Sequence, residues 1–370
     1  MPLDQSISIE SGKGDRAQYS LHGGATYAYE AQTGRRPLDF SQNVSPLGMP
    51  PAVREAIARA AGDADRYPDD DAHALRQALA GHLHVPEDWI LCGNGAADLI
   101  FRLAYALRPR RALLAAPGFS EYEAALNQVG CESDFYLLTG HEDLRVHEDI
   151  LPMIRPGVEL VVLAQPNNPT GLTIERPLLL EILRRCEAVG ARLMVDECFL
   201  DFLPDRGGLT LMGERSQALV VLSAFTKFYG CAGVRLGYCV CPDEKLLMKM
   251  KTAGPPWSVS TLAQAAGIAA LKETAYGERL RQLVAGEREY LAAGLRGMGL
   301  RVVEGQANFL LFYAEDEALA QKAAGEGIFI RDCRNFRGLG PGWYRIAVLE
   351  REKNERLLSF FKEVFGKEPG

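Results

Sequence analysis

The stretch LVVLSAFTKFYGCAGVRLGY, residues 219–238, decides how this chain is interpreted. Its apolar start, Leu219–Leu222, predicts a buried strand, and a short polar segment leads from that strand to Lys227. A lysine at the mouth of a buried strand is costly, because a desolvated ammonium must pair or lose its proton. Arg235 follows within AGVRLG, and the planar fork of an arginine matches the oxygens of a phosphate.

Lys227 and Arg235 are the residue types that a pyridoxal phosphate (PLP) site needs. A lysine with a lowered pKa can form an imine with the aldehyde of this cofactor. A nearby arginine can hold the cofactor phosphate. The alternative is a strand followed by a surface loop with two ordinary basic residues, and this segment alone leaves that alternative open.

The composition of the chain excludes several classes of protein. Its 370 residues carry a net charge of −7 with a pI near 5.6, which argues against a nucleic-acid-binding face. No apolar run approaches the length of a membrane span, and the first residues lack the apolar core of a signal peptide. The eight cysteines are scattered, so we expect reduced thiols, a cytoplasmic location and no metal site.

Apolar strand runs alternate with helical patterns from about residue 90 to 241. This alternation predicts an α/β fold, with a mostly parallel central sheet covered by helices on both faces. After the Gly254-Pro255-Pro256-Trp257 break the pattern changes to long amphipathic helices and short strands, which predicts a smaller α+β unit. The expected division is an N-terminal arm (1–45) packed with the small domain, a large PLP-binding domain (46–256) and a small domain (257–370).

Four further strand ends carry residues that a phosphate-bearing pyridine cofactor could use. A glycine-bearing turn at Gly95, Ala96 and Ala97 opens a helix, and such helix starts bind phosphate. Phe119 could stack on a pyridine ring, and Asn168 in QPNNPTG could donate to the ring oxygen. Asp196 in VDECF could pair with the protonated ring nitrogen. Each alone has a simpler reading as a turn or core residue, but their joint order along one sheet favours a PLP site, since ligands bind at the carboxyl ends of such strands.

NPTG at 168–171, the Asp196 segment and SAFTK…GVRLGY resemble the fold-type I PLP enzymes of the aspartate aminotransferase superfamily, class I/II. The resemblance covers nearly the whole chain, and it implies that Lys227 is the catalytic Schiff-base lysine. It assigns cofactor binding to Gly95, Ala96, Ala97, Phe119, Asn168, Asp196, Ser223, Thr226, Lys227 and Arg235. It also implies a homodimer with shared sites, in which Tyr67 of RYPDDD reaches the phosphate of the neighbouring subunit.

Within this superfamily the chain resembles threonine-phosphate decarboxylases and histidinol-phosphate aminotransferases. Several segments are similar to the decarboxylases, among them LHGG, LDFSQNVSPLG, PGFSEY, FLDF and IFIRDCRNFRGLG. The expected reaction is therefore decarboxylation of L-threonine O-3-phosphate to aminopropanol phosphate in cobalamin biosynthesis. The alternative is a histidinol-phosphate-type aminotransferase, which transfers an amino group to a 2-oxo acid.

The resemblance also suggests how a phosphorylated amino acid is held. Arg345 is assigned to the substrate carboxylate and Arg331 to the substrate phosphate, with Asn43 and His22 as helpers from the N-terminal arm. Three positions depart from the family pattern: Ala224 replaces a frequent phosphate-binding Ser or Thr, Phe199 replaces the tyrosine usual in the aminotransferase, and Cys198 replaces a usual alanine. We expect Ser223 to compensate for Ala224, and Cys198 to serve packing.

Overall fold

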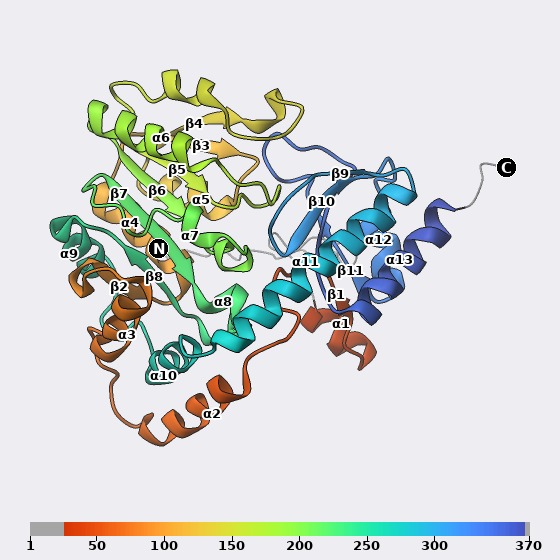
Figure 1. The fold of residues 1–370 in the computed structure, drawn as a ribbon, viewed down its shortest axis with the longest axis horizontal. Helices are drawn as coiled ribbons and strands as arrows, with labels where there is room; N and C mark the ends of the chain where they lie inside the picture. Colours follow the sequence, from red (N-terminus) through yellow and green to blue (C-terminus); the bar gives the residue numbers. More distant parts are fainter. Residues whose placement is uncertain (1–25, 367–370) are drawn as a thin grey trace, which may run out of the picture.

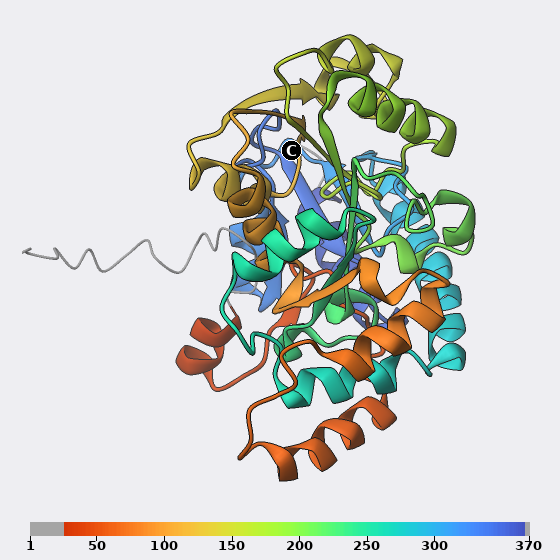
Figure 2. The ribbon, with the colours of Figure 1, turned by 90° about the vertical axis from the view of Figure 1, so that its left-hand side faces the viewer.

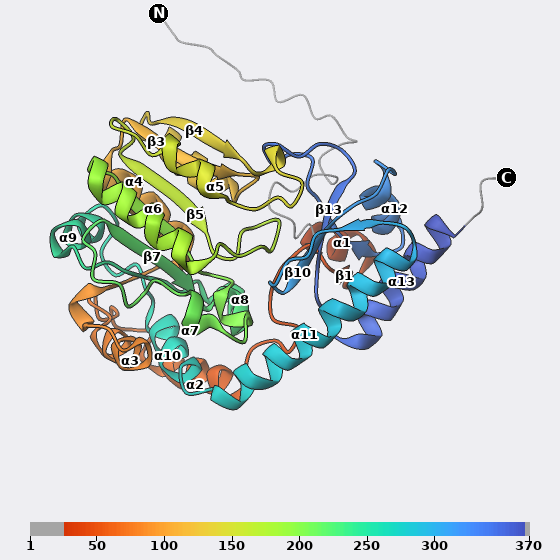
Figure 3. The same ribbon diagram turned by 45° about the horizontal axis from the view of Figure 1, so that its top comes forward.

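A computed structural model describes residues 26–366, in which two units lie side by side and the long helix α11 (Thr274–Gly297) runs between them (Figure 1 and Figure 3). The larger unit is built on a seven-stranded sheet and the smaller one on a four-stranded sheet. Helices cover the larger sheet on both faces, which confirms the α/β fold class predicted from the sequence.

The large sheet has the strand order β2-β8-β7-β6-β5-β3-β4. Its strands are β2 (Ile90–Gly93), β3 (Arg111–Ala116), β4 (Glu132–Leu137), β5 (Leu160–Ala164), β6 (Arg192–Asp196), β7 (Leu219–Ala224) and β8 (Gly237–Val240). All pairs from β7 to β4 are parallel, whereas β8 runs antiparallel to both of its neighbours. The parallel strands therefore end at one common edge, which faces the small unit.

The central strands are buried on both faces because apolar residues continue through them without polar alternation. On β5, Val161 and Leu163 join one core, while Leu160 and Val162 join the core on the opposite face. The large-unit helices are α2 (Pro51–Ala60), α3 (His73–Leu83), α4 (Gly95–Leu107), α5 (Ser120–Asn127), α6 (Arg176–Val189), α7 (Arg206–Leu209), α8 (Phe225–Phe228), α9 (Glu244–Thr252) and α10 (Thr261–Ala270). Residues of α4, α5 and α9 pack in one core, and residues of α3, α6 and α10 in the other.

Helix α10 packs on α2 and α3, although it follows the break at residue 257. The three views agree that α10 and α2 lie side by side at one end of the large unit (Figure 1, Figure 2 and Figure 3). Small residues of α10, Ala263, Ala266 and Ala270, are buried in the core of that unit. We therefore propose that the boundary between the large and small domains lies within α11 rather than at residue 256.

The small unit carries the antiparallel sheet β12-β13-β10-β9. Its elements are β9 (Arg301–Val302), β10 (Phe309–Tyr313), α12 (Leu319–Gly325), β11 (Ile328–Phe329), β12 (Arg331–Asp332), β13 (Trp343–Ala347) and α13 (Arg351–Phe365). The N-terminal segment joins this unit through α1 (Thr26–Thr33) and β1 (Leu38–Asp39), because β1 pairs in parallel with β11. Phe40, directly after β1, is completely buried in the small-unit core.

Two features of the large sheet were not expected from the sequence. Strand β4 is an edge strand whose residues are mostly half-exposed, so its sequence ESDFYL lacks the apolar run that marked the other strands. Strand β8 was expected from its apolar run, but an apolar run does not indicate the direction of a strand, and β8 runs antiparallel to β7. Across residues 26–366, no helix combines the length and the apolar character that crossing a bilayer requires.

Candidate active site

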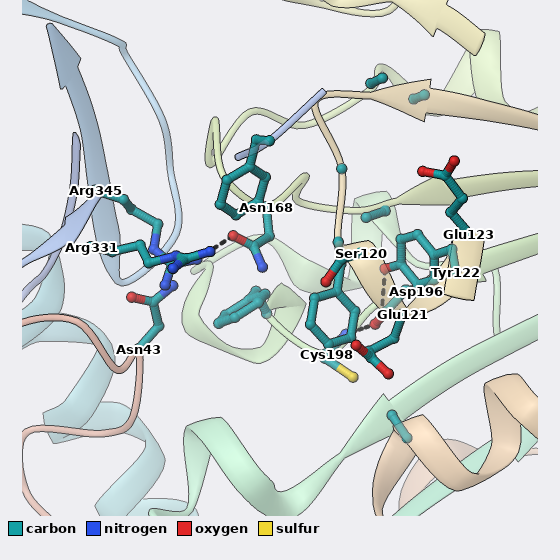
Figure 4. A pocket seen from close by; sticks show the side chains of 18 of the residues that line it. Asn43, Ser120, Glu121, Tyr122, Glu123, Asn168, Asp196, Cys198, Arg331 and Arg345 are labelled. Atoms are coloured by element: carbon teal, nitrogen blue, oxygen red, sulfur yellow. Dashed lines mark hydrogen bonds between the residues drawn. The ribbon is translucent and has the colours of Figure 1, made fainter. Parts of the chain in front are cut away.

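The edge at which the parallel strands end opens into a cavity of about 860 Å³ between the two units. Side chains of the large unit line one side, and the β12–β13 region and residues 41–43 line the other (Figure 4). The lining includes most residues singled out in the sequence: Asn43, Ala96, Ala97, Phe119, Asn168, Asp196, Thr226, Lys227, Arg235, Arg331 and Arg345. The fold thus gathers these residues, although they are spread over three hundred positions of the chain.

Lys227 lies in α8, directly after β7, and its side chain faces the cavity. The side chain is partly exposed, because the cavity opens onto it. Burial, together with the positive charges of Arg345 and Arg235, lowers the pKa of Lys227 to about 8. A substantial fraction of this amine is therefore neutral near physiological pH, as attack on an aldehyde requires.

An anion cradle lies where α4 begins, beside Arg235. Gly95 has a φ of +81°, and a Cβ built on it would lie 2.6 Å from Nη2 of Arg235. Gly237 on β8 is equally constrained, because its Cβ would lie 2.5 Å from the backbone nitrogen of Ala96. Glycine at both positions lets the guanidinium and the start of the helix approach each other. Backbone N–H groups, the helix dipole and an arginine then converge, which fits the phosphate of the expected cofactor.

Asp196 ends β6 and is almost completely buried. Its Oδ2 accepts a hydrogen bond from the hydroxyl of Tyr122 at 2.7 Å, and its Oδ1 accepts one from the backbone N–H of Cys198 at 2.9 Å (Figure 4). Phe119, one helical turn before Tyr122, contacts the Tyr122 ring edge-on at 5.6 Å between centroids. A carboxylate fixed in this way, with an aromatic ring beside it, fits a protonated pyridine ring.

Arg331 and Arg345 are direct partners across the antiparallel β12–β13 pair, so both guanidinium groups enter the cavity together (Figure 4). Arg345 donates to Oδ1 of Asn168 and, at 3.0 Å, to the carbonyl of Ser41. With its amide oxygen turned toward the guanidinium, Asn43 accepts from Nε of Arg345 at 3.2 Å. Since Asn168 accepts through its oxygen, its amide N–H groups remain as donors toward the cavity.

Both arginines are almost completely buried. Burial, together with the charge of Arg331, lowers the pKa of Arg345 to about 10. Within the described part of the chain, no carboxylate oxygen lies within 4.0 Å of the Arg345 guanidinium. Arg331 donates to Asn335 at 2.9 Å and lies 5.3 Å from the centroid of Phe336. Two buried guanidinium groups on neighbouring strands are costly to desolvate, and a doubly anionic ligand would offset that cost.

Three of the predicted residues that the structure describes lie outside the cavity wall. Ser223 does not line the cavity and lies opposite Tyr238 in the register of the β7–β8 pair. Gly95 lies beneath Arg235 instead of in the wall. Tyr67 is 79% exposed and stacks on Trp257 with ring centroids 4.5 Å apart. His22 lies outside the described residues.

Sequence reasoning missed the bonds that Tyr122 and Cys198 make to Asp196. The signal for Tyr122 was its position one helical turn after Phe119, which puts both side chains on one helix face. Arg337 lines the cavity, bonds to Glu123 at 2.6 Å and lies 3.9 Å from the centroid of the Phe135 ring.

Known proteins resemble this chain in sequence and in fold. The model of the family described as aminotransferase class I and II matches residues 35–361. The threonine-phosphate decarboxylase of Salmonella typhimurium is 40% identical over 354 residues, covering 93% of this chain and 96% of the relative. The histidinol-phosphate aminotransferase of Methanocella arvoryzae is 33% identical over 334 residues, covering 89% and 90%. The structure of histidinol-phosphate aminotransferase from Sinorhizobium meliloti in complex with pyridoxal-5'-phosphate is 25% identical, with a TM-score of 0.84 and coverage of 98% and 99%.

Proposed function

The chain belongs to the class I and II aminotransferase family, and from this premise we propose that it decarboxylates a phosphorylated amino acid, most specifically L-threonine O-3-phosphate. The products are aminopropanol phosphate and carbon dioxide, a step of cobalamin biosynthesis. Membership in the family confirms the resemblance stated from the sequence, and the protein is a PLP-dependent enzyme.

The cavity residues have matching roles toward this cofactor. When bound, PLP links to the substrate amino group and draws the electrons of the breaking bond into its ring. Lys227 supplies the neutral amine that binds the aldehyde and is the group placed to move protons at the substrate Cα. Asp196 would hold the ring nitrogen, and an N–H of Asn168 would donate to the ring oxygen. Arg235 would bind the cofactor phosphate.

The remaining cofactor contacts surround these residues. Phe119 would stack on the cofactor ring, and Thr226 and the start of α4 at Ala96 and Ala97, which line the cavity, would complete the phosphate site. Ser223 has no part in this arrangement, because it does not line the cavity.

The observation that carries the substrate assignment is the pair of buried arginines, Arg331 and Arg345, in direct register. A substrate with two anionic groups, a carboxylate and a phosphate, matches two cations fixed on adjacent strands. Arg345 is next to Asn168 and so closer to the expected ring, which suits the carboxylate at Cα. Arg331 then receives the phosphate at the other end of the substrate.

The choice of decarboxylation over transamination depends on which Cα bond the arginines hold perpendicular to the cofactor ring. The decarboxylase is the relative with 40% identity, compared with 33% for the aminotransferase of Methanocella arvoryzae. Phe199 lines the cavity where the aminotransferase usually has a tyrosine, and its ring packs edge-on against Phe309 at 5.0 Å. Both facts favour the decarboxylase.

The expected homodimer and cytoplasmic location remain predictions. The exposed pair of Tyr67 and Trp257 supports the dimer, since large stacked aromatic rings at a surface are typical of protein interfaces. In that dimer, Tyr67 would reach the phosphate site of the other subunit.

Incubation of the holoenzyme with L-threonine O-3-phosphate, without any 2-oxo acid, tests the proposal. We expect carbon dioxide and aminopropanol phosphate in equal amounts, and no product from a Lys227→Ala variant. A parallel incubation with histidinol phosphate and 2-oxoglutarate tests the aminotransferase alternative. Turnover only in that second reaction would replace the decarboxylase assignment with the aminotransferase one.

A further inference from the structure

The loop between β12 and β13 (residues 333–342) holds one of the two cavity arginines. Oδ1 of Asn335 accepts a hydrogen bond from Nη2 of Arg331 at 2.9 Å. The ring of Phe336 lies beside the same guanidinium, with 5.3 Å between its centroid and Cζ of Arg331. Because this β12–β13 loop joins the strands that carry Arg331 and Arg345, its position affects where both guanidinium groups lie in the cavity.

The next residue of the β12–β13 loop, Arg337, reaches across to the large unit. Its Nη2 lies 2.6 Å from Oε1 of Glu123, a residue of α5 that lines the cavity from the large-unit side (Figure 4). Its Cζ lies 3.9 Å from the centroid of the Phe135 ring on β4. An ion pair and a cation–π contact thus connect the large unit to the loop segment that holds Arg331.

The β12–β13 loop also packs on the large unit through its backbone and its apolar side chains. A Cβ built on Gly338, which has a φ of +85°, would lie 3.3 Å from Oγ1 of Thr139. Leu339 belongs to an apolar cluster that includes Leu144 and Leu172 of the large unit. These contacts bring the loop close to the large unit, and the ion pair adds a charged contact with a defined direction.

We propose that Arg337 is a positioning residue, which fixes the β12–β13 loop on the large unit and thereby sets where Arg331 holds the substrate phosphate. The inference rests on the proposed function, because it concerns the substrate of that same site. In that function the small unit holds both anionic groups of the substrate, whereas the large unit holds the cofactor. The contact between Arg337 and the large unit therefore influences which Cα bond stands perpendicular to the cofactor ring.

The Cα bond that breaks decides the products of L-threonine O-3-phosphate. Loss of the carboxylate gives carbon dioxide and aminopropanol phosphate, and no inorganic phosphate. If the Cα–H bond breaks instead, its proton passes to the amine of Lys227, and its electrons form a Cα=Cβ double bond that expels the phosphate. Addition of one water then gives one molecule each of inorganic phosphate, 2-oxobutanoate and ammonium. The fraction of turnovers that release inorganic phosphate therefore reports how the substrate is oriented.

The experiment compares the holoenzymes of the wild type, Arg337→Gln, Glu123→Gln and the double variant. Carbon dioxide, inorganic phosphate and the KM for threonine phosphate are measured for each. Arg176→Gln is the matched control, because Arg176 forms a half-buried ion pair with Glu214 within the large unit and neither residue lines the cavity. Only folded enzyme contributes to the ratio of the two products, so a partial loss of folded protein leaves that ratio unchanged.

We expect the phosphate-releasing fraction to rise about 3- to 30-fold in Arg337→Gln, together with KM, since an ion pair and a cation–π contact are lost. Glu123→Gln should change both quantities in the same direction by a smaller factor. The double variant should match Arg337→Gln, because residues that act through one contact are not additive. The control should keep the wild-type values.

Two results would overturn the role of Arg337. One is a wild-type product ratio and KM in Arg337→Gln. The other is a raised KM in Arg337→Gln with an unchanged or lowered KM in Glu123→Gln, which would mean that Arg337 binds the substrate directly.

A wild-type enzyme that forms no carbon dioxide from threonine phosphate would overturn the proposed function instead. The same variants are then compared by their KM for histidinol phosphate, which also presents a phosphate to Arg331. An unchanged KM for histidinol phosphate in Arg337→Gln would then overturn the role of Arg337.

Discussion

Replacement of Gly95 by alanine should lower both the stability of the fold and the affinity for the cofactor. The new Cβ would lie 2.6 Å from Nη2 of Arg235, which is closer than two such heavy atoms can approach. The guanidinium must therefore leave its place above the start of α4. Gly95 lies where the start of α4 and the guanidinium of Arg235 would both contact the cofactor phosphate.

The expected size of the effect has two parts. A residue with a Cβ at a φ of +81° costs about 1–2 kcal/mol in the folded state. Displacement of Arg235 removes a charge-assisted hydrogen bond to the cofactor phosphate, which contributes about 1.5–3 kcal/mol. Only the second part enters binding, so the PLP dissociation constant should rise about 10- to 100-fold.

Gly190→Ala is a matched control for Gly95→Ala. Gly190 has a φ of +75° at the end of α6, but nothing lies within 4 Å of its virtual Cβ. Both variants should unfold at lower denaturant concentration by similar amounts, whereas only Gly95→Ala should change the PLP dissociation constant in a titration followed by absorbance. Wild-type PLP affinity in Gly95→Ala would refute the assignment of the cradle to the phosphate.

Three further predictions concern charged groups. Arg331→Gln should raise the KM for threonine phosphate about 10- to 100-fold, through loss of a charged contact, while PLP affinity stays at the wild-type value; steady-state kinetics and a PLP titration check this. The rate at which cofactor-free protein captures PLP should rise with pH around a midpoint near 8, not near 10.5, since burial lowers the pKa of Lys227; stopped-flow absorbance measures it. Burial raises the pKa of Glu197 from 4.5 to about 8, so the folded state binds more protons and stability should fall as pH rises from 4.5 to 8. Glu197→Gln should lack this decline in urea unfolding, and an identical pH dependence in both proteins would contradict the assignment.

The sequence was enough to predict which strand-end residues lie close together in the fold. The strand ends at Lys227, Asp196 and Asn168 follow continuous apolar runs, and a parallel sheet brings such ends together regardless of chain distance. The sequence also placed Arg331 and Arg345 on short strands of the small unit, and these strands pair antiparallel with the two arginines opposite each other.

The rest depended on packing that a linear pattern does not contain. Ser223 and Ala224 are neighbours in the chain, but strand alternation turns them to opposite faces, and only Ala224 lines the cavity. The large-unit position of α10 follows from its contacts with α2, whereas its sequence shows only an amphipathic helix. Nothing in the sequence indicated that the backbone N–H of Cys198 donates to Asp196, because that bond depends on how the loop after β6 folds in three dimensions.

The pairing of β1 with β11 has a consequence for biosynthesis. Leu38 finds its partner Ile328 only after the ribosome has produced most of the chain, and Phe40 has no core to enter until then. The large unit can bury its own apolar faces earlier, so the nascent protein passes through a stage in which the large unit is folded and β1 is unpaired. An unpaired strand edge is a ready template for intermolecular pairing, and chaperone demand should therefore concentrate in the last stage of translation.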